Sequence, residues 1–150
     1  MAEKFDLEQQ IGATVGEVWK VLTNKDEIGK WMPKGDYVAK TEINEKELAL
    51  WDTIIVKKGL IEIHFKVTKK ENHCLVLTSG SGARGFVRFD LDVGERGTKV
   101  KVHGEFNGLM SHFALSDIKN FFSLAISNMR GISETEEKNV KDWLKREPLL

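Results

Sequence analysis

Four histidines are the first side chains to consider for acid–base chemistry or metal binding: His64, His73, His103 and His112. Their spacing matches no metal-ligand pattern, and no HExxH pair is present. His64 and His103 alternate with apolar residues in strand-like segments, so we expect both to face solvent. His112 opens a long helical segment where that segment should meet the strands. It is therefore the histidine best placed to reach a bound molecule.

Asp52 and Arg84 are charged residues in unusual surroundings. Asp52 interrupts a strand pattern that is otherwise apolar, and a charge on an apolar face is costly unless it is paired or solvated. Asp52 could be a carboxylate inside a cavity. Alternatively it lies on the outer face of the strand, and Ala49, Trp51 and Ile55 then face the core. The pattern favours the outer face. Arg84, between glycines, could reach a ligand carboxylate or ring oxygen, but the pattern favours a turn arginine in water.

Other catalytic and cofactor motifs are not supported. Residues 80–85 spell G-x-G-x-x-G, but this stretch joins strand to strand, whereas a dinucleotide site needs a strand-to-helix turn. Cys74 is the only cysteine, which excludes an internal disulfide and a multi-cysteine metal site. No nucleophile-elbow motif is present. The sequence predicts no catalytic residue, no metal and no cofactor.

Length and composition predict an ordinary globular domain spanning residues 1–150. The chain is 41% hydrophobic and 31% charged, as expected for one domain with one core. Its 23 basic and 23 acidic residues cancel, so no global field would attract nucleic acid or an anionic membrane. The first residues lack the apolar run of a signal peptide, and no stretch approaches the roughly 20 apolar residues of a membrane span. We expect a cytoplasmic protein.

The element that must position any site is a long amphipathic helix over residues 109–145. At 100° per residue, one face of this segment is apolar. That face carries Met110, Ala114, Ile118, Phe121, Phe122, Ala125, Met129 and Ile132, and later Val140 and Trp143. The helix must lie across a sheet, because neither can bury its apolar face alone. We expect Trp143 to pack on that sheet.

The preceding residues predict seven strands with two short helices between the first and the second. Thr14 and Glu17 have the spacing of a capping box, Asn24 and Glu27 repeat this pattern, and Pro33 stops the second helix. Apolar residues recur with period two in the strand segments. These segments are 5–11, 36–43, 47–56, 61–67, 74–79, 85–93 and 100–106. The fold class is α+β, a curved antiparallel sheet wrapped around the long helix.

This order is the helix-grip arrangement, and residues 13–24 and 28–33 resemble the opening helices of the START-like (SRPBCC) superfamily. Residues 56–65, 80–85 and 104–109 are similar to the CoxG-like family of carbon monoxide dehydrogenase subunits. The resemblance implies a cavity for an apolar or amphipathic molecule, and a carbon monoxide dehydrogenase-like complex as a protein partner. Some CoxG-like proteins carry an apolar tail; here the sequence stops directly after the helix, so it gives a membrane role no support.

We expect the cavity to lie between the sheet and the long helix. Its predicted lining is Phe65, Val67, Val87, Phe89, Met110, Phe113, Phe121, Phe122, Ala125 and Met129. Asp52, Arg84 and His112 are the polar residues that could reach it. A non-enzymatic binder needs only the apolar lining, whereas an enzyme of the polyketide cyclase or dehydratase kind needs converging polar groups. The residues favour the binder. A co-chaperone of the Hsp90-activator kind is a third hypothesis with the same fold.

Overall fold

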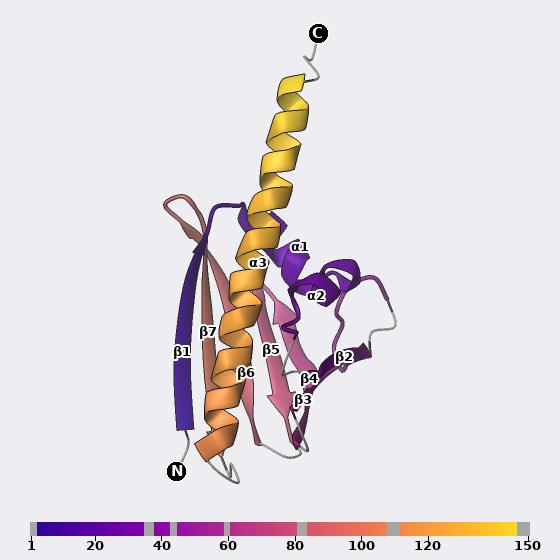
Figure 1. Ribbon diagram of the computed structural model, residues 1–150, viewed down its shortest axis with the longest axis vertical. Coiled ribbons are helices and arrows are strands. Elements are labelled where there is room, and N and C mark those ends of the chain that lie inside the picture. The colour runs from indigo at the N-terminus through magenta and orange to yellow at the C-terminus, as the bar shows by residue number, and fades with distance from the viewer. Residues whose placement is uncertain are drawn as a thin grey trace.

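The computed structural model describes residues 3–34, 38–42, 45–58, 61–80, 84–107 and 112–146. They form an α+β fold in which a long C-terminal helix crosses an antiparallel sheet (Figure 1). The elements are β1 (Glu3–Ile11), α1 (Val15–Thr23), α2 (Lys25–Trp31), β2 (Val38–Glu42), β3 (Thr53–Lys58), β4 (Ile61–Glu71), β5 (Cys74–Ser79), β6 (Arg84–Gly94), β7 (Gly97–Asn107) and α3 (His112–Arg146).

The sheet has the strand order β1-β7-β6-β5-β4-β3-β2. The first strand therefore pairs with the last, and the connection from β1 to β2 runs through α1 and α2. These two short helices lie beside α3 on the same side of the sheet (Figure 1). No helix of the described residues is long and apolar enough to cross a membrane.

The two short helices begin at the predicted capping residues. Thr14 Oγ1 accepts a hydrogen bond from the backbone N–H of Glu17 at 3.2 Å. Asn24 ends α1 and also begins α2, because its Oδ1 accepts from the backbone N–H of Asp26 at 3.0 Å. One residue thus serves as the C-cap of α1 and the N-cap of α2.

The core alternates along the strands as the sequence predicts. Phe5 and Ile11 of β1 point inward, and Asp6 and Glu8 point outward. Phe5 lies opposite Gly104 of β7, where a Cβ atom would come within 2.3 Å of the Phe5 ring. The absence of a side chain at Gly104 is what lets this ring lie flat against the sheet.

The prediction of a strand over residues 47–56 is wrong for the first half of that range. Residues 50 and 51 form a turn, and β3 begins only at Thr53. Asp52 causes this, because its Oδ2 accepts from the backbone N–H of Ala49 at 2.7 Å and competes with strand pairing. Trp51 adopts a φ of 75° and is 69% exposed, so the expectation that it faces the core is wrong.

The expectation that Trp143 packs on the sheet is also wrong, since this side chain is 58% exposed. The 35 residues of α3 span about 52 Å at 1.5 Å per residue, whereas an 11-residue strand spans about 36 Å. The helix is therefore longer than the sheet, and its C-terminal end projects beyond the rest of the molecule (Figure 1). The apolar residues of α3 keep their helical spacing in the part of the helix that projects beyond the sheet.

Replacing a buried and an exposed tryptophan in turn tests whether Trp143 packs on the sheet. Trp31 of α2 is buried, and its Nε1 donates to the carbonyl oxygen of Val21 at 2.8 Å. We expect Trp31→Ala to lower the free energy of unfolding by about 3–5 kcal/mol. Trp143→Ala should change it by no more than about 0.5 kcal/mol, as at other exposed positions. Urea denaturation of both variants measures the difference, and similar losses would mean that Trp143 is packed.

Candidate functional site

The apolar interior between the sheet and α3 contains the predicted ligand-binding residues. Eight of the ten are described with their side chains, and each is at most 2% exposed. They are Phe65, Val67, Val87, Phe89, Phe121, Phe122, Ala125 and Met129. They come from β4, β6 and α3, which are distant in the sequence, and they belong to one buried cluster. Met110 lies outside the described residues, and Phe113 is described only as part of the α3 backbone.

Phe122 is at the centre of this interior. Its ring meets Phe65 of β4 and Phe89 of β6 edge to face, each with 5.7 Å between ring centroids. It also meets Phe121 edge to face at 5.2 Å. Edge-to-face pairs of this kind add attraction beyond the burial of area. The α3 backbone comes closest to β1, β7, α1 and α2, so on the β4 side the space is bridged by large side chains such as Phe65 and Phe122.

The three predicted polar residues lie in different surroundings. Asp52 is buried, so the expectation that it lies on the outer face is wrong; its carboxylate is held by its own turn. Arg84 is exposed at the first position of β6, in agreement with the solvated alternative. His112 begins α3, and its side chain lies outside the described part of the structure. The chemistry of the described lining is therefore that of apolar contact.

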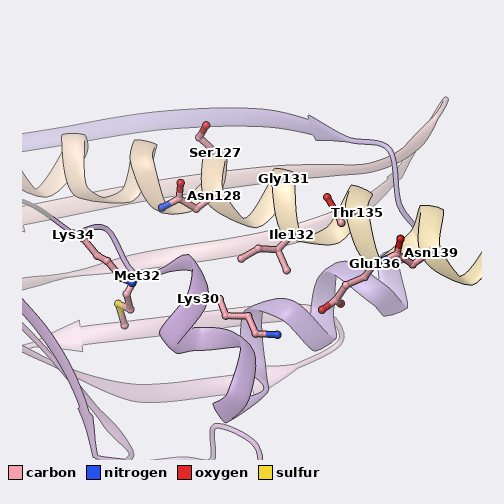
Figure 2. Close-up of a pocket in the computed structure, with 10 residues that line it drawn as sticks. All are labelled: Lys30, Met32, Lys34, Ser127, Asn128, Gly131, Ile132, Thr135, Glu136 and Asn139. Carbon is pink, nitrogen blue, oxygen red and sulfur yellow. The ribbon is translucent and has the colours of Figure 1, made fainter.

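A hollow of about 880 Å³ lies between α2 and α3, where sequence reasoning predicted no site (Figure 2). Its lining is Lys30, Met32, Lys34, Ser127, Asn128, Gly131, Ile132, Thr135, Glu136 and Asn139. Asn128 Nδ2 donates to the backbone oxygen of Trp31 at 3.1 Å, which joins α3 to the end of α2. The one sequence signal was Glu136, a charged residue on the apolar stripe of the long helix.

A second hollow, of about 630 Å³, lies on the outer face of the sheet over β1, β6 and β7. His103 Nδ1 lies 2.7 Å from Asp6 Oδ1, and its Nε2 lies 3.0 Å from Glu105 Oε1. Hydrogen bonds to Asp6 and then to Glu105 raise the pKa of His103 above 6.5. Within the described residues, no set of His, Cys, Asp and Glu side chains is arranged to hold a metal ion.

No protein-family model and no curated protein matches the sequence. Several solved structures share the fold. The Aha1 dimer from Colwellia psychrerythraea has a TM-score of 0.68 and 16% identity, covering 88% of this chain and 96% of that one. The AHSA1-like protein from Aeromonas hydrophila has a TM-score of 0.65 and 16% identity, covering 89% and 94%. A conserved protein of unknown function from Enterococcus faecalis has a TM-score of 0.66 and 20% identity, covering 91% and 74%.

These similarities show an α+β fold with an antiparallel sheet and a long C-terminal helix. At these identities the likeness extends to the fold and not to a ligand or a reaction.

The His103 cluster makes stability depend on pH. Because the folded-state pKa is raised, its stabilisation is full below about pH 6.5 and is lost as pH rises through the raised value. We expect the difference in unfolding free energy between the parent and His103→Gln to shrink from pH 6 to pH 9. Imidazole NMR should show a titration midpoint above 6.5 that falls in Asp6→Asn. An unchanged midpoint would mean that Asp6 does not hold the proton on His103.

Proposed function

We propose that the protein binds a small apolar or amphipathic molecule between the sheet and the N-terminal half of α3. The observation that carries this proposal is the aromatic interior around Phe122, on the side where the α3 backbone stands away from β4. A ligand there would take the place of contacts between these side chains. The cellular role would be that of a carrier, a sensor or an accessory protein, as the resemblance to CoxG-like carbon monoxide dehydrogenase subunits suggests.

The lining favours binding over catalysis. Phe65, Phe89 and Phe122 offer ring faces and edges to a flat apolar molecule, and Ala125 is the smallest side chain of the lining. None of the eight described lining residues can donate or accept a proton, whereas acid–base catalysis needs such a group within hydrogen-bonding reach of the substrate. An enzyme of the cyclase or dehydratase kind would have to use Asp52, Arg84 or His112.

Filling the interior from α3 tests the binding site. We expect Ala125→Phe to weaken binding of the apolar dye 1-anilinonaphthalene-8-sulfonate about tenfold or more, equivalent to about 1.4 kcal/mol. Leu124→Phe is the matched control, because Leu124 is the adjacent α3 residue and is 49% exposed. Fluorescence titration measures affinity, and circular dichroism checks folding. Ala125→Val serves if the larger side chain prevents folding. A folded Ala125 variant with unchanged dye affinity would place the ligand elsewhere.

The polar residues separate a binder from an enzyme. For a binder, Asp52→Asn, Arg84→Ala and His112→Ala should each leave dye affinity within about tenfold of the parent. For an enzyme, at least one of them should abolish turnover of a carbonyl substrate while the fold remains intact. Native mass spectrometry of the purified protein would supply the candidate molecule, as a co-purified lipid or quinone-like compound.

A co-chaperone of the Hsp90-activator kind is the second candidate. Its support is the fold shared with the Aha1-like and AHSA1-like structures, together with the exposed Trp143 on the projecting end of α3. Exposed aromatic residues are frequent anchors in protein interfaces. This function requires the protein to raise the ATPase rate of an Hsp90, and Trp143→Ala should reduce that effect while Ala125→Phe should not.

A further inference from the structure

Three carboxyl groups come together where α3 leaves the body of the protein, since the Glu136 side chain interacts with those of Glu17 and Glu27. Glu17 comes from α1, Glu27 from α2 and Glu136 from α3. Glu27 is only 6% exposed. One oxygen of each group, Glu17 Oε1, Glu27 Oε2 and Glu136 Oε2, is buried and receives no hydrogen bond from a donor. Buried carboxylate oxygens without a donor are costly, so something must offset their charge.

The charged groups around the cluster do not balance it. Lys30 Nζ of α2 lies 3.4 Å from Glu27 Oε1. The buried oxygen that receives no hydrogen bond is the other one, Glu27 Oε2. Lys20 of α1 acts on Glu136 from the other side. Two lysines therefore face three carboxyl groups. Two adjacent carboxylates cannot both stay ionised cheaply, but one proton between them turns repulsion into a hydrogen bond.

A proton fits this cluster better than a ligand does. The three oxygens are closed off from solvent, so a molecule in the adjacent hollow could not reach them without a rearrangement. Of the three glutamates, only Glu136 borders that hollow. Figure 2 shows its side chain directed from α3 toward the short helices, at the same end of the hollow as Lys30.

We propose that Glu136 shares a proton with Glu17 and Glu27, and that this proton latches α3 to α1 and α2. When the proton is lost, repulsion drives the Glu136 carboxylate into the neighbouring hollow, which has room for it, and the contact between α2 and α3 loosens. The latch lies just beyond Ser133, the last fully buried residue of α3 that the structure describes. It thus controls how firmly the projecting part of the helix is held.

The direction of the pH effect follows from two causes. Burial, and then hydrogen bonding with Glu136, raises the pKa of Glu27 above 4.5. Hydrogen bonding with Glu17, and then burial, raises the pKa of Glu136. Groups with raised folded-state pKa values stabilise the protein below their ordinary pKa, and this stabilisation is lost as pH rises through the raised values. The latch is therefore closed in mild acid and open at higher pH.

Carboxyl NMR titration of the intact protein tests the shared proton directly. We expect Glu27 and Glu136 to titrate together, with midpoints above 4.5. Independent titration of both groups at or below 4.5 would overturn the proposal. This measurement needs no variant, so it decides the question even if a substitution at the cluster prevents folding.

Amide hydrogen exchange tests the latch itself. In the parent, exchange from α2, corrected for the intrinsic effect of pH, should speed up through the titration by about tenfold per unit of raised pKa. Glu136→Gln should reduce this dependence, because a glutamine amide donates to the other two carboxyl groups at every pH and only the effect of burial on Glu27 remains. Glu27→Gln is the second variant, and Glu137→Gln, at the next position of α3, is the control that should behave like the parent. The same pH dependence in Glu136→Gln and in the parent would show that no such latch exists.

Discussion

The packing of Phe122 against Phe65 and Phe89 is the contact that the rest of the structure depends on. It joins α3 to β4 and β6, the part of the sheet that the α3 backbone does not approach closely. Since the sheet is paired from β1 to β2 without a break, fixing its middle strands against the helix sets the position of both edges. Burial of this aromatic group stabilises the fold, and the same group forms the surface that a ligand would meet.

The unequal lengths of helix and sheet divide α3 into two parts with different properties. Up to Ser133 its inner face is buried, and there the apolar stripe is covered by strands and by the short helices. Beyond that residue Glu134 still contacts the end of β1, where its Oε1 accepts from the backbone N–H of Gly12 at 2.9 Å, and the stripe continues through Glu136 to the exposed Trp143. Helix stability in proteins comes mainly from packing of one face. The C-terminal part of α3 therefore depends on the few contacts made near Glu134 and Glu136.

Much of the fold could be predicted from local patterns. Apolar residues that recur every two positions mark the buried face of a strand, and those that recur about every 3.6 positions mark the buried face of a helix. The alternation of Phe5 to Ile11 and the caps at Thr14 and Asn24 were predicted correctly. Asp52 was not, since its side chain bonds to the backbone of its own turn and breaks a strand that hydrophobicity favours. The cluster of Asp6, His103 and Glu105 depends on the register between β1 and β7, which no local pattern contains. The eight apolar residues were predicted to line a cavity between the sheet and the long helix; the structure places them in one buried cluster, and the cavity stays a prediction.

Glu136 shows how a misfit in the sequence can be informative. It stands in the apolar sector of α3, where a solvated charge would interrupt the stripe. In the structure the residue remains on the inner side, but it faces two other carboxyl groups in place of a sheet. A carboxyl group is tolerated there only if it can take up a proton and become neutral. The misfit thus marks the point where α3 changes from a core helix, held by apolar contact at every pH, to a projecting one held by groups that titrate.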